Sequence, residues 1–147
     1  MAIYENKRKK KKGKTTMWIV ILVVFVVIII TAGAGILFTS GERKEGLNLK
    51  ISSTDFKNLK DGTYIGEYAG GKYKWRANKV QVTVSSGKVT DINLLLNKEN
   101  RPAEFTDKLF GRVIESQSLQ VDAISGATIT SKAYLKSVED ALDKADE

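Results

Sequence analysis

The feature that most constrains this chain is a long apolar segment that carries no charge. No residue from Thr15 to Gly41 is charged, and Trp18–Phe38 is apolar all round, with no polar stripe at helical spacing. At about 1.5 Å of rise per residue, these 21 residues span roughly 31 Å, which matches the roughly 30 Å hydrocarbon core of a bilayer. A surface helix is excluded, and the sequence predicts one transmembrane helix over residues 17–38.

The charges on either side of this helix predict its orientation. Seven Lys and Arg residues precede it, whereas Arg43 and Lys44 follow it. Because cytoplasmic flanks carry the excess of Lys and Arg, we expect residues 1–16 to form a basic cytoplasmic tail and the C-terminal domain to be extracytoplasmic. A cleaved signal peptide is the alternative. The apolar stretch exceeds the usual h-region of about 7–15 residues, which favours an uncleaved signal anchor, single-pass in the cell membrane.

The distribution of charge and the absence of His and Cys exclude several classes of function. Of the formal net charge of +7, residues 1–41 hold +6 and residues 42–147 hold +1. A basic run can be a nucleic-acid arm, but beside a membrane helix it favours a topology signal, so we expect no nucleic-acid partner. The chain has no His and no Cys, which excludes Cys/His zinc sites, haem ligation by His, Ser-His-Asp triads, disulfides and lipidated cysteines. We expect no metal, and redox chemistry would need a bound organic cofactor.

After a predicted stalk over residues 39–56, residues 57–147 have the composition of one small folded domain. Alternating apolar residues predict strands over residues 63–68, 79–84 and 89–96. The segment Ser85–Lys88 is a hairpin turn signal, and a change of apolar phase predicts a β-bulge near Thr90 and Asp91.

Two helices are predicted after the strands. Pro102 suits a first helical turn, and apolar residues at helical spacing continue that helix to about Ser116. A second helix is expected to begin near Ser131, capped by Thr130 or Ser131. Strands followed by helices, without βαβ alternation, predict an α+β fold: a small antiparallel sheet with two packed helices, preceded by one N-terminal transmembrane helix.

Residues 121–131, between the two predicted helices, concentrate the candidate chemistry. A turn of small residues that leads into a helix offers unpaired backbone N–H groups and the positive end of a helix dipole, which together suit a phosphate. The hydroxyls of Ser125, Thr128, Thr130 and Ser131 add donors. Such turns are also common as simple helix caps, and on these residues alone both interpretations stay open.

The segment Asp122–Thr128, DAISGAT, resembles the Asp-x-x-Ser/Thr-Gly-Ala-Thr signature of the FMN-binding domain family. That family occurs in subunits of sodium-pumping NADH:quinone oxidoreductases, in Rnf complexes and in small extracytoplasmic flavoproteins. The resemblance extends over most of residues 60–143, with Asp61–Gly66 similar to the opening strand and Val80–Ile92 to the central hairpin. The Rnf-type and sodium-pump subunits are longer than this chain, so membership of those complexes does not follow.

The resemblance implies FMN as the cofactor, held as a phosphoester on Thr128 by a flavin transferase that uses FAD and magnesium. Asp122 would belong to the sequence that the transferase reads. The remaining expected cofactor-binding residues are Ser125, Gly126, Ala127 and Thr130. A phosphoester needs only a hydroxyl, which suits a chain without His or Cys.

The function implied by the resemblance is electron transfer between a membrane donor and an acceptor, neither of which the sequence identifies. No catalytic acid–base pair is evident, so we name no catalytic residue and expect a carrier rather than an enzyme in its own right. The alternative is a non-redox module that binds FMN or another ligand reversibly, for sensing or scaffolding.

Two further groups of residues remain open. Aromatic side chains could pack on a flavin ring, although aromatics on a half-buried sheet more often form core or rim: Tyr64, Tyr68, Tyr73 and Trp75. Basic side chains nearby could steer an acidic partner or hold phosphate, although such clusters usually form a solvated face: Lys72, Lys74, Arg76 and Lys79.

Overall fold

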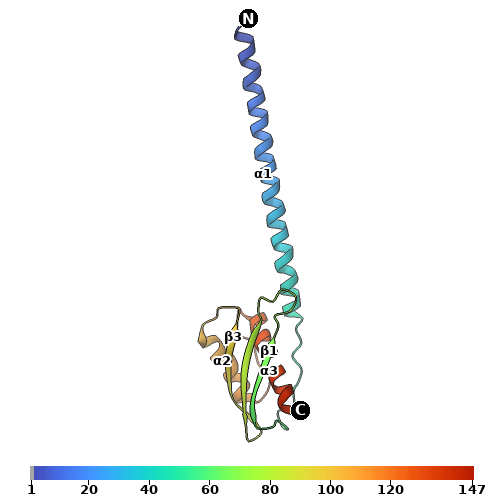
Figure 1. Cartoon of the computed structure of the whole chain (residues 1–147), viewed down its shortest axis with the longest axis vertical. Helices are drawn as coiled ribbons and strands as arrows, with labels where there is room; N and C mark the ends of the chain where they lie inside the picture. Colours follow the sequence, from blue (N-terminus) through green and yellow to red (C-terminus); the bar gives the residue numbers. More distant parts are fainter. Residues whose placement is uncertain (1) are drawn as a thin grey trace. The chain divides into compact units, whose positions relative to one another are not determined.

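The computed structural model describes residues 2–147, with side chains from Thr15 onward. The chain divides into two compact units, the first ending at Gly41 and the second comprising Glu42–Glu147. The described residues form three helices and one three-stranded antiparallel sheet, in the order α1, β1, β2, β3, α2, α3 (Figure 1). The predicted α+β fold with an apolar N-terminal helix is confirmed.

Helix α1 spans Ala2–Leu47 and contains a segment that is long and apolar enough to cross a membrane. The large apolar side chains of this segment are exposed. Its hydroxyl groups, on Thr31, Thr39 and Ser40, donate to carbonyl oxygens three or four residues earlier, at 2.9–3.1 Å. These polar groups are thus satisfied inside the helix, as a lipid environment requires.

Strands β1 (Gly62–Tyr68), β2 (Asn78–Ser85) and β3 (Lys88–Asn97) pair in the order β1-β2-β3. A two-residue turn joins β2 to β3, and both of its residues, Ser86 and Gly87, have positive φ, at 55° and 70°. Type I′ hairpins require this conformation, and it fixes the register of the hairpin.

The β-bulge predicted near Thr90 and Asp91 is present. Thr83 pairs with Asp91, whereas the next residue, Val84, pairs with Val89. Thr90 is therefore the extra residue, and it restores the phase that brings the apolar residues of β3 to the buried face.

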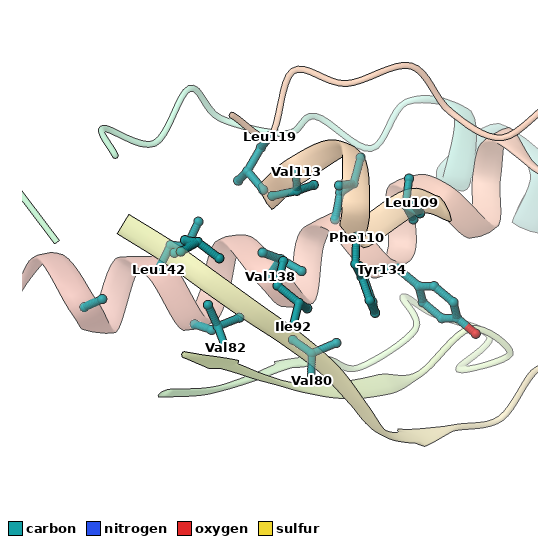
Figure 2. Packing of buried hydrophobic residues seen from close by; sticks show 14 of the residues in the cluster. Val80, Val82, Ile92, Leu109, Phe110, Val113, Leu119, Tyr134, Val138 and Leu142 are labelled. Carbon is teal, nitrogen blue, oxygen red and sulfur yellow. The ribbon is translucent and has the colours of Figure 1, made fainter. Parts of the chain in front are cut away.

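Helices α2 (Ala103–Ser116) and α3 (Thr128–Asp146) cover one face of the sheet, with α3 against β1 and β2 and α2 against β3. Helix α2 ends where the sequence predicts, because Gln117 is in the left-handed conformation with φ 49°. The core lies between this face and the helices, as Figure 2 shows for Val80, Val82, Ile92, Leu109, Phe110, Val113, Leu119, Tyr134, Val138 and Leu142.

The residues that follow Gly41 pack on the domain as part of the second unit. The Lys132 ammonium donates to the Leu47 carbonyl at 2.7 Å, and the Ser52 N–H donates to Glu139 at 3.1 Å. Burial raises the pKa of Glu139, but hydrogen bonds from Lys136 and Ser52 outweigh it and lower the pKa overall. Part of the predicted stalk is thus held on α3. The predicted boundaries at residues 16, 38 and 56 remain predictions.

Candidate functional site

The signature residues form a tight turn that leads into α3. The Ala127 N–H donates to the Ile124 carbonyl at 2.9 Å, which closes a four-residue turn over Ser125 and Gly126. Gly126 has φ +74°, typical of the third position of a type II turn and costly for residues with a Cβ. The backbone of the turn therefore accounts for a glycine at this position.

Helix α3 begins at Thr128, directly after this turn, and not near Ser131 as predicted. The N-cap residue is Ala127, which makes no side-chain cap, so the predicted capping by Thr130 or Ser131 is wrong. The first N–H groups of any α-helix lack a partner within the helix. Among the described residues none accepts a hydrogen bond from the N–H of Thr128 or Ile129, so both can receive an anion at the positive end of the helix.

The hydroxyl groups of this region lie in two different environments. Thr130 and Ser131 are 1% and 0% exposed, whereas Ser125 and Thr128 are exposed. The Ser131 hydroxyl donates to the N-cap carbonyl at 2.9 Å and accepts the Ile124 N–H at 3.0 Å. The Thr128 hydroxyl makes no hydrogen bond to any described residue. Ser131 therefore holds the turn in place, while Thr128 is accessible to a reagent.

Thr130 belongs to a cluster of charged side chains beneath the first turn of α3. Its hydroxyl donates to Glu99 at 2.8 Å and accepts from Arg76 at 3.4 Å and from Arg101 at 3.3 Å. Arg101 pairs with Glu99 at 2.6 Å, and Arg76 pairs with Glu42. Thr130, predicted to bind the cofactor, thus has its hydroxyl engaged by protein. The sequence did not predict this cluster, because its members lie in two helices and two loops that no local pattern connects.

Arg112 of α2 holds the start of the signature. Its guanidinium donates to the Asp122 carbonyl at 2.5 Å and lies 3.5 Å from the Ala123 carbonyl. The backbone at Asp122 is therefore fixed, while the residue itself is exposed. An exposed carboxylate on a fixed backbone is open to contact with another protein.

An open groove lies beside the signature. It is lined by residues 47–51 and 119–123, together with Lys132 and Leu135 of α3. Thr128 precedes Lys132 by one helical turn, so the two residues lie on the same face of α3. The groove combines apolar side chains with charged groups, which suits a planar ligand that has a polar edge.

The donors at this site suit an anion rather than a cation. Within the part of the chain that the structure describes, no group of three or more acidic, His or Cys residues could hold a metal ion. The start of α3 instead offers backbone N–H groups and the exposed hydroxyls of Ser125 and Thr128. These groups fit the phosphate of a nucleotide-like cofactor such as FMN.

Comparisons with known proteins bear directly on this turn. Residues 74–143 match the model of the FMN-binding domain family. The NADH:acrylate oxidoreductase of Vibrio harveyi is 37% identical over 70 residues, which cover 45% of this chain and 7% of that protein, so the chain spans a small part of this relative. The crystal structure of the CPE2226 protein from Clostridium perfringens is 28% identical, covers 60% of this chain and 89% of that one, and has a TM-score of 0.45.

The turn at the start of α3 and the family match together indicate a flavin-binding domain. More particularly, residues 74–143 match the FMN-binding domain family, and this match indicates FMN as the cofactor. The resemblance predicted from the signature is confirmed. The matched segment begins in the loop before β2 and ends within α3, so it includes the whole turn and Thr128.

Proposed function

We propose that this chain is a membrane-anchored extracytoplasmic flavoprotein that carries FMN as a phosphoester on Thr128 and passes electrons between a membrane donor and an acceptor. The proposal rests above all on the Thr128 hydroxyl, which is exposed, has no hydrogen-bond partner among the described residues and begins an uncapped helix. The family match supports the cofactor, and the oxidoreductase name of the Vibrio harveyi relative supports the redox role.

The chemistry of attachment needs only what this turn provides. The Thr128 oxygen forms a bond to the phosphorus of the FMN half of FAD, AMP leaves, and the hydroxyl proton is released, with a flavin transferase and magnesium activating FAD. The N–H groups at the start of α3 then stabilise the negative charge of the phosphodiester. FMN, once bound, supplies reversible one- and two-electron chemistry. A covalent link keeps it beside its site at a high effective concentration.

The other signature residues take supporting roles in this proposal. Ser125, Gly126 and Ala127 hold the backbone of the turn around the phosphate, and Asp122 presents its carboxylate to the transferase. Thr130 supports the start of α3 through its charged cluster. The groove beside Thr128 would hold the flavin ring.

The intact mass of the full-length chain, co-produced with a flavin transferase, tests the attachment. Wild type should gain the mass of one FMN less one water. Thr128→Val should gain nothing while it stays folded, because the Thr128 side chain makes no hydrogen bond to any residue that the structure describes. Ser125→Ala is the matched control, since it removes the other exposed hydroxyl of the turn and should retain the adduct. An adduct on Thr128→Val, or none on wild type, contradicts the assignment. A yellow colour that denaturation removes would indicate reversible binding instead.

The proposed orientation rests on the excess of cations before the apolar helix. Protease added to intact cells or protoplasts should digest the domain and spare the N-terminal tail. Protection of the domain would place it in the cytoplasm and contradict the extracytoplasmic assignment.

A further inference from the structure

We infer, resting on the proposed membrane anchor, that the loop between β1 and β2 is a lipid-binding surface. Its residues Lys72, Tyr73, Lys74 and Trp75 would rest on the headgroups of the membrane that the chain itself crosses. These side chains lie outside the buried core and outside the FMN turn.

The side chains of this loop are of the kinds that accumulate at a membrane surface. Trp75 is 42% exposed, Lys72 and Lys74 are exposed, and Tyr73 is half-buried. The rings of Tyr73 and Trp75 are 6.2 Å apart, and the Lys72 ammonium lies 5.8 Å from the centre of the Tyr73 ring. Trp and Tyr place an apolar ring and a polar edge at headgroup level, and Lys is attracted to anionic lipid phosphates.

The loop is bonded to Glu42 and Glu45, which follow the apolar segment in the sequence. The Lys72 N–H donates to the Glu45 carboxylate at 3.1 Å, and Arg76 pairs with Glu42. Both glutamates are therefore engaged by the loop. The ammonium groups of Lys72 and Lys74 form no ion pair with any side chain that the structure describes. The loop thus presents positive charge that lipid phosphates would complement.

The length of chain between the apolar span and these bonds limits the distance of the loop from the membrane. Glu42, which pairs with Arg76, is four residues beyond Phe38, the last residue of the apolar span. A chain reaches at most about 3.3–3.6 Å per residue, so Glu42 lies within about 14 Å of Phe38. The headgroup layer is about 5–7 Å thick on each side of a bilayer. A loop held at Glu42 is therefore close enough for its side chains to reach the headgroup layer.

The chain contains two tryptophans, Trp18 and Trp75, which allows a matched pair of fluorescence measurements. The full-length chain, without FMN, is placed in phosphatidylcholine and phosphatidylglycerol vesicles that contain a headgroup-spin-labelled lipid. The Trp18→Phe variant then reports on Trp75, and the Trp75→Phe variant reports on Trp18. We expect both variants to lose emission relative to unlabelled vesicles. For Trp75 the loss should be larger with the headgroup label than with a label deep in the acyl chains.

Each other outcome contradicts the inference. The outcomes differ in whether they also contradict the proposed membrane anchor. Quenching of Trp18 with none of Trp75 shows an inserted chain whose loop stays off the lipid, so only the loop assignment fails. Absence of quenching in both variants contradicts the membrane anchor itself. Stronger quenching of Trp75 by the deep label contradicts a headgroup location.

The two lysines provide a second measurement. Lys74 has φ 55°, a left-handed conformation that Asn tolerates, so Lys72→Gln with Lys74→Asn removes both charges with little strain. Near an anionic surface these two charges should shift the docked-to-undocked ratio by about 30-fold. Trp75 quenching should fall in vesicles that contain phosphatidylglycerol and change little in phosphatidylcholine alone. An unchanged value in both lipids contradicts the role of the lysines.

Discussion

The first turn of α3 has two sides, which are similar in sequence and different in the fold. On one side Thr128 is exposed and has no partner among the described residues, and on the other Thr130 is buried and hydrogen-bonded. Ser131 is only about 60° from Thr128 around the helix, and it is buried because its hydroxyl bonds to the Ile124–Ala127 turn. Positions 128 and 130 are about 200° apart around the helix, so a spacing of two residues reverses the environment. Thr128 and Thr130 have the same side chain, and it is their position around the helix that makes one hydroxyl accessible and the other structural.

The Thr130→Val variant should give the largest effect, and it tests whether the Thr130 hydroxyl is structural. We expect FMN attachment to persist, while the free energy of unfolding falls by about 2–3 kcal/mol, because Glu99 and two arginines lose a hydrogen-bond partner. Chemical unfolding of the detergent-solubilised chain measures the stability, and intact mass measures the attachment. Thr130→Ser, which keeps the hydroxyl, should recover most of the loss. A variant that loses the adduct at unchanged stability would place Thr130 on the cofactor side.

Ser131→Ala tests the buried hydroxyl that is bonded to the turn. It removes the hydroxyl that joins the N-cap carbonyl to the Ile124 N–H, and we expect a loss of about 1–2 kcal/mol in unfolding free energy. Flavinylation should slow without being abolished, because Thr128 keeps its hydroxyl while the turn loosens. A time course of the mass gain measures this rate. A complete absence of attachment would mean that Ser131 takes part in the chemistry.

Gly126→Ala tests the conformation of the turn alone. Apart from its two chain neighbours, no described residue has an atom within 4 Å of a Cβ added at Gly126. The expected loss of about 1 kcal/mol in unfolding free energy therefore comes only from the positive φ. Gly126→Asn should cost less, because Asn tolerates the left-handed conformation. Thermal unfolding of the two variants compares them. Equal losses in both would point to a contact that Gly makes with its ligand instead.

The smallest expected effect lies away from the turn, at Glu139. Its pKa is lowered in the folded chain, so its ionised form contributes stability that is present above the ordinary pKa of 4.5 and is lost as the pH falls through the folded value. Glu139→Gln should therefore be less stable than wild type by less than about 1 kcal/mol at neutral pH, and the difference should vanish in acid. Thermal unfolding against pH measures it, and FMN attachment should not change. A difference that is constant with pH would exclude the charge as its cause.

The sequence predicted the elements whose signals are local. The Ser86-Gly87 turn, the bulge at Thr90 and the end of α2 at Ser116 each follow from a few adjacent residues. A second irregularity, at Leu95, was not predicted, and it leaves Leu96 57% exposed although its spacing from Ile92 suggests the buried face. The alternation of apolar residues along a strand does not show where a β-bulge shifts its register with the neighbouring strand.

The parts that the sequence did not predict depend on long-range contacts. Hydroxyls near Ser131 suggested a cap, but the helix begins at Thr128, because the turn at Gly126 already directs the chain into it. The polar residues after Gly41 suggested a linker, yet the bond between Ser52 and Glu139 joins positions 87 residues apart. The choice of Thr128 as the expected acceptor came from the family signature, whereas the exposure of Thr128 and the burial of Thr130 required the fold.

Gly46 lies where α1 ends, and the side chain of Ile129 is so close to it that a Cβ at residue 46 would overlap that side chain. Ile129 adjoins Thr128, so a flavin attached there would lie beside the last residues of α1. With the membrane anchor that we propose, an electron partner in the same membrane would reach this flavin by diffusion in two dimensions instead of three. The rate of exchange would follow lateral diffusion and the number of partner molecules per unit of membrane, and bulk concentration would have little influence.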